Sequence, residues 1–310
     1  MFRQRTITAL VLAPLAICAI LFLPHGLFAL LTAAAFLVAL WEWTRLLGYA
    51  RTTLRLGLVG VQALLLAALW FAREAPLWWI AIVAGVAWWL LAMWWLRHFS
   101  FAAAPTRENG WLKLGAGCLV VLPAWAALME LHGSDARGPA WTLFGLILVW
   151  VAASGAYLAG SRWGAGTKKL APRISPGKTW VGVYGAIAAS ALAAVIGAWV
   201  LDARGAVLLG VVVLAMLTVA FSIVGDLFES LIKRHANAKD SGDLIPGHGG
   251  MFDRLDSVFA ALPVWACGLA LLGLCGLSRE AGRRSRCHRV DWRLRARRDR
   301  ARCHPRGRWS

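Results

Sequence analysis

The chain has 310 residues, of which 60% are hydrophobic and only 15% are charged. Soluble domains are about 45–50% apolar and about 25% charged, so this composition excludes an ordinary soluble domain and indicates an integral membrane protein. The formal net charge is +18, but the last 34 residues supply +10 of it, with 13 Arg against 3 acidic residues. The positive net charge is therefore no argument for binding nucleic acid, and we expect no nucleic-acid partner.

Nine apolar segments are long enough to cross a bilayer as helices, which takes roughly 17–25 residues for about 30 Å of hydrocarbon. None alternates polar and apolar residues like a barrel strand, and the backbone of a single span is satisfied in lipid only as a helix. We predict an all-α, polytopic integral membrane protein with about nine transmembrane helices. The predicted spans are Thr6–Leu23, Leu27–Leu47, Leu54–Phe71, Leu77–Leu96, Trp111–Met129, Trp141–Gly160, Trp180–Val200, Ala206–Gly225 and Val258–Gly276.

Basic residues collect in alternate loops. Lys and Arg are enriched on the cytoplasmic side of membrane proteins, which predicts that the loops after spans two, four, six and eight face the cytoplasm. The N-terminus is then inside and the end of the ninth span outside. The basic residues of these loops are Arg45, Arg51, Arg55, Arg97, Arg107, Lys113, Arg162, Lys168, Lys169, Arg173, Lys178, Lys233, Arg234 and Lys239.

The loop between spans six and seven contains "KLAPRISPGKTW". Its "GKT" is not a phosphate-binding P-loop, because that motif needs a glycine at the position of Pro172. We expect Ser175, Lys178 and Thr179 to complete a nucleotide or lipid-phosphate pocket. The alternative is a basic loop that only anchors the topology.

The segment "SLIKRHANAKDSGDLIPGHGGMFDRLDS" (230–257) is strongly polar between two apolar spans. If the eighth helix continues through it, Asp226, Ser230, Lys233 and Arg234 share one helix face. The ninth helix then begins with two aspartates, Asp253 and Asp256, three residues apart on one face. Between the helices, Pro246 stops regular structure, and Gly247, Gly249 and Gly250 allow turns whose backbone N–H groups can approach an anion.

Carboxylates this close to hydrocarbon cost on the order of 2.5–3.5 kcal/mol each unless they are compensated. Mg²⁺ would compensate them, because it prefers one or two carboxylates together with phosphate oxygens, and Asp226 with Asp253 or Asp256 is a suitable ligand set. The neighbouring cations would then bind substrate phosphates. The alternative is a solvated loop that sets topology. The proposed phosphate-binding cations are Lys233, Arg234, Lys239 and Arg254.

The pattern from Ser230 to Asp256, with "IPGHGG" at its centre, resembles the signature of the phosphatidate cytidylyltransferase (CDP-diacylglycerol synthase) family. The resemblance extends to "FRQRTITALVLAP", "WEW", "SGAYLAG", "KLAPRISPGKTW" and "VGDLFES" and covers the chain to about Leu277. It implies that phosphatidic acid attacks the α-phosphorus of CTP and releases pyrophosphate. It also implies a multi-pass protein of a bacterial-type inner membrane, with its active site facing the cytoplasm.

The resemblance implies roles for individual residues. Asp226 and Asp253 would hold Mg²⁺, supported by Asp256 and Asp240, and no protein nucleophile is needed because the lipid phosphate is already an anion. A second cation such as K⁺ and a homodimer are left open, and His248 could instead be a turn residue. The expected partners are CTP, phosphatidic acid and the lipid bilayer. The residues expected to bind or orient phosphates are Ser230, Lys233, Arg234, Lys239, His248, Gly249, Gly250 and Arg254.

Two positions depart from the family pattern: Ala153 stands where relatives carry Asp, and Val181 where they carry Glu. A weakened or inactive homologue is therefore one alternative. A transporter is another, although the chain shows no convincing inverted repeat.

We divide the chain into a membrane domain (1–277), with N-terminal spans in 1–130 and catalytic spans in 140–277, and an Arg-rich tail (278–310). The tail's composition predicts disorder and resembles out-of-frame translation of a GC-rich gene; the alternative is a lipid-surface anchor.

Overall fold

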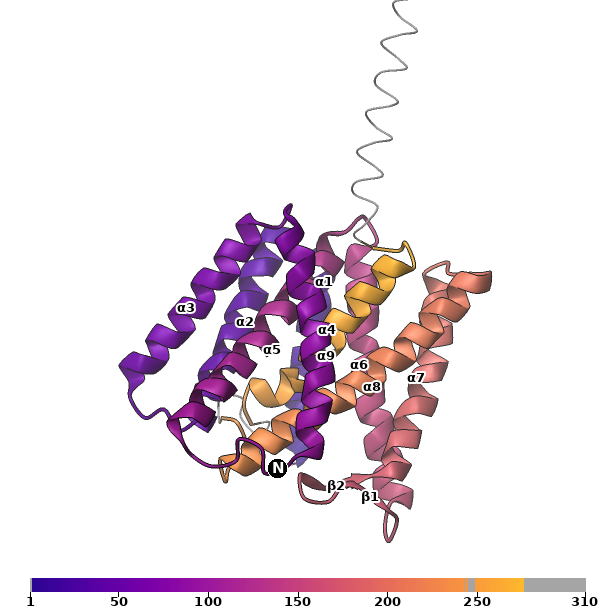
Figure 1. Ribbon diagram of the computed structural model, residues 1–310. Coiled ribbons are helices and arrows are strands. Elements are labelled where there is room, and N and C mark those ends of the chain that lie inside the picture. Colours follow the sequence, from indigo (N-terminus) through magenta and orange to yellow (C-terminus); the bar gives the residue numbers. More distant parts are fainter. Residues whose placement is uncertain (1, 243, 245–248, 276–310) are drawn as a thin grey trace, which may run out of the picture.

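The protein is a bundle of membrane-length helices (Figure 1). The computed structural model describes residues 2–242, 244 and 249–275, with side chains from residue 11 onward. The Arg-rich tail and His248 lie outside the described residues. Within them the elements are α1 (Phe2–Phe22), α2 (His25–Leu46), α3 (Thr52–Phe71), α4 (Pro76–Arg97), α5 (Arg107–Gly133), α6 (Gly138–Trp163), β1 (Lys169–Ala171), β2 (Ser175–Thr179), α7 (Trp180–Val200), α8 (Gly205–His235) and α9 (Phe252–Leu271).

The helices confirm the predicted all-α polytopic architecture. Each of the nine predicted spans coincides with one described helix, and eight of these are long and apolar enough to cross a membrane. In α1 the segment with described side chains, Val11–Phe22, is apolar but shorter. The expected extension of the eighth helix is also confirmed, because α8 runs for 31 residues and ends at His235.

A short antiparallel hairpin interrupts the helices, and sequence reasoning did not predict it. Its two strands, β1 and β2, pair Lys169 with Thr179 and Ala171 with Ser175. They form from the basic loop "KLAPRISPGKT", where two prolines and a glycine disfavour a helix. The hairpin lies at the same end of the bundle as the start of α1, whereas α9 ends at the opposite end (Figure 1).

The helices α8 and α9 pack closely, and their contact sets the geometry of the charged end. A Cβ built on Gly225 would lie 2.4 Å from the carbonyl oxygen of Asp256 and 2.9 Å from the Cβ of Ala260. Only glycine therefore allows the two backbones to approach this closely. The acidic residues that flank this crossing are consequently held near one another.

Large indole rings fill the interior and tie the helices together. Trp43, Trp89 and Trp265 are fully buried, and each donates its indole N–H to a backbone carbonyl on another helix. A buried indole normally finds such a partner, because an unpaired N–H in the interior is costly. These hydrogen bonds therefore tie α9 to α4 and α6, and α2 to α5.

Candidate active site

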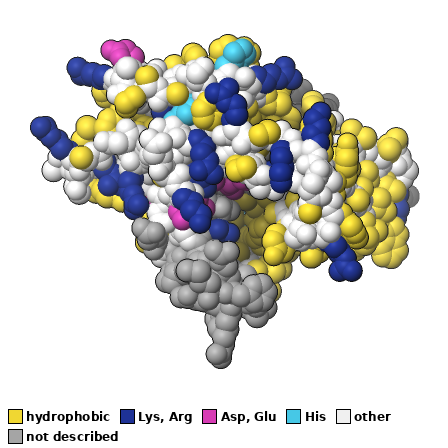
Figure 2. All heavy atoms as spheres, turned by 90° about the horizontal axis from the view of Figure 1, so that it is seen from below, with side chains coloured by type: hydrophobic (Ala, Val, Ile, Leu, Met, Phe, Trp, Pro, Cys, Tyr) yellow, Lys and Arg dark blue, Asp and Glu magenta, His cyan; other side chains and the backbone are white. Residues whose placement is uncertain are grey.

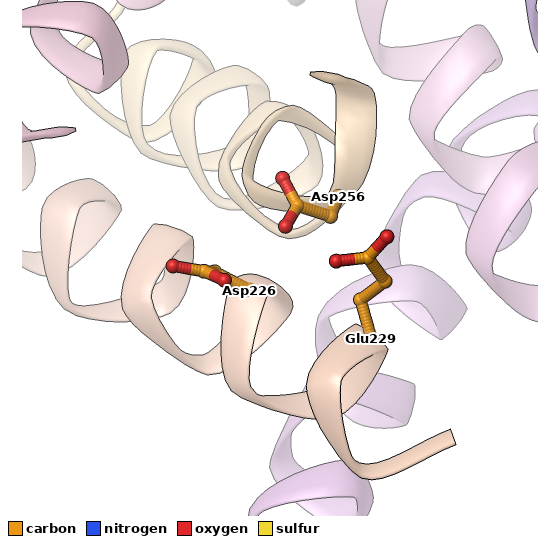
Figure 3. Close-up of side chains that lie close together, drawn as sticks. All are labelled: Asp226, Glu229 and Asp256. Atoms are coloured by element: carbon orange, nitrogen blue, oxygen red, sulfur yellow. The ribbon is translucent and has the colours of Figure 1, made fainter. Parts of the chain in front are cut away.

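Three carboxylates converge where α8 and α9 cross (Figure 3). Asp226 and Glu229 come from α8 and Asp256 from α9, and one oxygen of each lies within 4.8 Å of the others. Glu229 and Asp256 are buried and Asp226 is half-buried. Asp226 and Glu229 share a face because they are three residues apart on α8. We call these three residues the acid cluster.

A lysine links the acid cluster to the start of α9. The ammonium nitrogen Nζ of Lys233 lies 2.9 Å from Oε2 of Glu229 and 2.7 Å from Oδ1 of Asp253. The other oxygen of Asp253 accepts backbone hydrogen bonds from Ser241 (3.0 Å) and Gly250 (2.8 Å). Asp253 therefore compensates Lys233 and holds the two ends of the segment between the helices.

The hairpin brings a second lysine to the acid cluster. Nζ of Lys178, on β2, lies 2.5 Å from Oδ2 of Asp226. The hairpin is held in place by Arg234, whose Nε donates to the carbonyl of Ile174 at 3.1 Å. Arg173 adds a cation–π contact, with its guanidinium carbon 4.7 Å from the centre of the Phe99 ring. Lys178 and Arg234, two basic residues expected to bind phosphate, thus also hold the hairpin against α8.

The remaining expected site residues occupy several environments. Thr179 is buried, and its hydroxyl caps α7 by accepting from the backbone of Gly182 at 3.2 Å. Gly249 has a φ of +80°, a conformation that favours glycine. Ser230 and Ser175 are half-buried, and His248 lies outside the described residues. The exposed members of the expected set are Arg234, Lys239, Asp240 and Arg254.

Sequence reasoning expected Asp226 with Asp253 and Asp256 as the metal ligands. The structure brings Asp226 and Asp256 together and adds Glu229, which was not singled out, while Asp253 bonds to Lys233 and to backbone amides. The spacing of Asp226 and Glu229 on one helix could have revealed the third acid. A second omission is Glu42, the only acidic residue of its predicted span.

The acid cluster has capacity for a divalent cation. Oε1 of Glu229 is buried and has no hydrogen-bond partner among the described residues. A buried, unpaired carboxylate oxygen is costly unless a cation approaches it. Carboxylate oxygens are also the ligands that Mg²⁺ and Ca²⁺ prefer. Asp226 and Asp256 could contribute the remaining protein ligands.

The fold and the site together define a polytopic membrane protein with a cluster of acidic side chains and neighbouring lysines at one end of its helical bundle. Comparison with known sequences identifies the family. The chain belongs to the cytidylyltransferase family, whose sequence pattern matches residues 3–272. The resemblance drawn from the motifs is thereby confirmed.

Individual relatives support this assignment over most of the chain. The phosphatidate cytidylyltransferase of Pseudomonas aeruginosa is 40% identical over 283 residues, which cover 89% of this chain and 98% of the relative. The protein of the same name from Haemophilus influenzae is 32% identical over 287 residues, covering 86% and 98%. That of Brucella suis is 43% identical over 135 residues, covering 44% and 48%.

Proposed function

We propose that this protein transfers the cytidylyl group of CTP to phosphatidic acid, forming CDP-diacylglycerol and pyrophosphate. The observation that carries the proposal is the acid cluster between Lys178 and Lys233, at the end of a membrane bundle whose full-length relatives are named phosphatidate cytidylyltransferases. Neither the site nor the relatives favour the transporter alternative.

The reaction needs positioning and charge compensation more than a protein nucleophile. A phosphate oxygen of phosphatidic acid forms a bond to the α-phosphorus of CTP. The bond from that phosphorus to the bridging oxygen of the β-phosphate breaks, and its electron pair leaves with pyrophosphate. Because both substrates are anions, the site must first bring like charges together.

The acid cluster would hold a divalent cation such as Mg²⁺, with Asp226, Glu229 and Asp256 as its protein ligands. When bound, the cation supplies positive charge that neutralises phosphate oxygens. Asp253 would act beside this set by holding Lys233, whose ammonium group also contacts Glu229. A requirement for a second cation such as K⁺ stays a prediction.

The basic side chains would bind the phosphates of the two substrates. Lys178 is the best placed, because the ammonium group that now pairs with Asp226 can reach a phosphate held beside the same carboxylate. We assign the same task to the exposed Lys239 and Arg254, and propose that Ser175, Ser230, Thr179, His248 and the amides of Gly249 and Gly250 orient the phosphates. Asp240 would support the acids that hold the cation. The homodimer stays a prediction.

We further propose that the site faces the cytoplasm of a bacterial inner membrane. The hairpin, the C-terminal end of α8 and the start of α9 lie at one end of the bundle (Figure 1), and Lys and Arg side chains are spread over that end (Figure 2). Basic residues favour the cytoplasmic side. CTP is a cytosolic nucleotide and phosphatidic acid a membrane lipid, so a site at this boundary meets both.

The proposal is tested with purified protein in liposomes containing phosphatidic acid, supplied with CTP labelled at its α-phosphate and Mg²⁺. We expect label in the lipid fraction, none when diacylglycerol replaces phosphatidic acid, and none with Asp226→Asn. A failure of the wild-type protein to label the lipid would refute the function. A slow rate relative to the Pseudomonas aeruginosa relative would instead support a weakened homologue. Accessibility of the site to CTP added to inside-out vesicles tests its orientation.

A further inference from the structure

Glu42 lies far from the polar segment in sequence but makes several contacts with it. It belongs to α2, a predicted membrane span, and only 4% of its surface is exposed. Its Oε1 accepts a hydrogen bond from the backbone of Met251 at 3.0 Å, and its Oε2 accepts one from the backbone of Phe252 at 2.9 Å. The hydroxyl of Ser241 also donates to Oε2 at 3.0 Å. Both carboxylate oxygens are therefore committed to the segment that joins α8 to α9.

These contacts make Glu42 the cap of α9. The first turn of a helix leaves backbone N–H groups without intrahelical partners, and its positive end favours an anion. Met251 and Phe252 stand at the start of α9, and the side chain of the N-cap residue Met251 makes no capping hydrogen bond. Glu42 supplies the missing acceptors from another helix. Its own helix is anchored by Trp43, which donates to the carbonyl of Lys113 and packs 5.1 Å from the Phe252 ring.

The same carboxylate explains why glycines flank the segment. A Cβ on Gly242 would lie 2.5 Å from Oε1 of Glu42, and its three nearest atoms would all belong to this side chain. A Cβ on Gly250 would lie 2.2 Å from Oε2 of Glu42 and from the hydroxyl of Ser241. The Glu42 side chain thus occupies the space that larger residues at these positions would need.

Glu42 is connected to the proposed ligands through shared residues. Ser241 donates its hydroxyl to Glu42 and its backbone N–H to Asp253. Gly250 packs against Glu42 and donates its N–H to the same Asp253 oxygen. Asp253 in turn pairs with Lys233. A shift of the Glu42 carboxylate would therefore displace the acceptor that holds this lysine, together with the first turn of α9.

We propose that Glu42 is a positioning residue for cytidylyl transfer, which fixes both ends of the α8–α9 segment and the start of α9, and thereby orients Asp253, Lys233 and Asp256. The inference rests on the proposed function. It assigns a role to α2, whose other residues take no part in the site described above.

The test compares Glu42→Gln with Glu108→Gln in the full-length protein, in liposomes containing phosphatidic acid. Both carboxylate oxygens of Glu42 face backbone N–H donors, so the glutamine amide nitrogen must oppose one of them in either orientation. Glu108 is exposed in the first turn of α5 and provides the matched control. We expect kcat per folded molecule to fall about tenfold to a hundredfold in Glu42→Gln, the loss expected when catalytic groups are displaced by about 1 Å. In Glu108→Gln, kcat should stay at the wild-type value. The half-saturating Mg²⁺ concentration should rise only in the former.

A double-mutant cycle tests the contact behind this effect. Gly242→Ala should lower kcat in the wild-type protein but cause no further loss in Glu42→Ala, because the added methyl group then meets no carboxylate. If Glu42→Gln does not fold, Ser241→Ala takes its place, since it removes only the hydroxyl donor; we expect a loss of about tenfold or more, as for one hydrogen bond to a charged group.

The outcomes separate the inference from the function on which it rests. Equal kcat per folded molecule in Glu42→Gln and Glu108→Gln, or additive losses from Gly242 and Glu42, would overturn the positioning role while the wild-type protein still formed CDP-diacylglycerol. Loss of folded protein with unchanged kcat and unchanged Mg²⁺ dependence would reduce Glu42 to a purely structural residue. A wild-type protein that forms no product would refute the proposed function itself.

Discussion

Two clusters of buried polar side chains lie at opposite ends of α2, and they differ in how far their hydrogen bonds are satisfied. At the end where α2 begins, His132 bonds through both ring nitrogens, to the carbonyl of Ile20 and to Nδ1 of His25, at 3.0 Å each. Beside it, Glu130 accepts from the indole N–H of Trp78 at 2.9 Å. Buried polar groups that are paired in this way stabilise one packing arrangement.

The other cluster lies near the end of α2, roughly 25 Å away along a helix that rises 1.5 Å per residue. There Oε1 of Glu229 has no hydrogen-bond partner among the described residues, and Asp226 exposes 40% of its side chain. The comparison teaches that burial of charge alone does not identify a site. What distinguishes the candidate active site is unused capacity to bind a cation, next to lysines that can bind anions.

The strongest test of this difference is Glu229→Gln. The amide oxygen can still accept from Lys233, and the amide nitrogen can donate to a neighbouring carboxylate of the acid cluster, so we expect the melting temperature to be kept or raised. We expect kcat to fall about 100-fold or more, because the substitution removes a proposed ligand of the divalent cation whose charge would neutralise the phosphates. The measurement is label transfer from CTP to lipid together with a thermal melt. Normal turnover in this variant would exclude Glu229 as a cation ligand.

A smaller effect is expected from Lys178→Met. Nζ of Lys178 is buried, but Asp226 exposes 40% of its side chain and remains partly solvated, so the free energy of unfolding should change by about 1 kcal/mol. The half-saturating CTP concentration should rise about tenfold, as for the loss of one charge-assisted hydrogen bond of roughly 1.5 kcal/mol. Lys169→Met, at an exposed position on the same hairpin, is the control. Equal CTP dependence in the two variants would leave Lys178 with a topological role only.

The smallest effect is expected from Glu130→Gln, in the hydrogen-bonded cluster near the start of α2. The amide oxygen can replace the carboxylate as acceptor for the indole of Trp78, so we expect a change in unfolding free energy of about 1 kcal/mol or less. Turnover per folded molecule should be unchanged. The same substitution at Glu229 then gives a matched pair, measured in one assay. A loss of turnover at Glu130 comparable to that at Glu229 would contradict the distinction between the two ends.

The sequence alone determined the membrane architecture and the position of the charged segment. Each span is recognisable because about 30 Å of hydrocarbon demands a long apolar helix, a requirement that is local in sequence. The helical spacing of Asp226, Ser230, Lys233 and Arg234 followed from the periodicity of α8, which the structure confirms as one helix to His235. The motif between residues 230 and 256 was sufficient to indicate the family.

Only the tertiary structure decided which charged groups meet. Glu229 joins Asp226 and Asp256 because α8 and α9 approach closely at Gly225, and that register depends on packing between helices. Lys178 reaches Asp226 because its loop forms a hairpin, which composition did not reveal. The bonds of Glu42 join residues about 200 positions apart, and no local pattern in either segment encodes them, since they arise only when α2 packs against the start of α9.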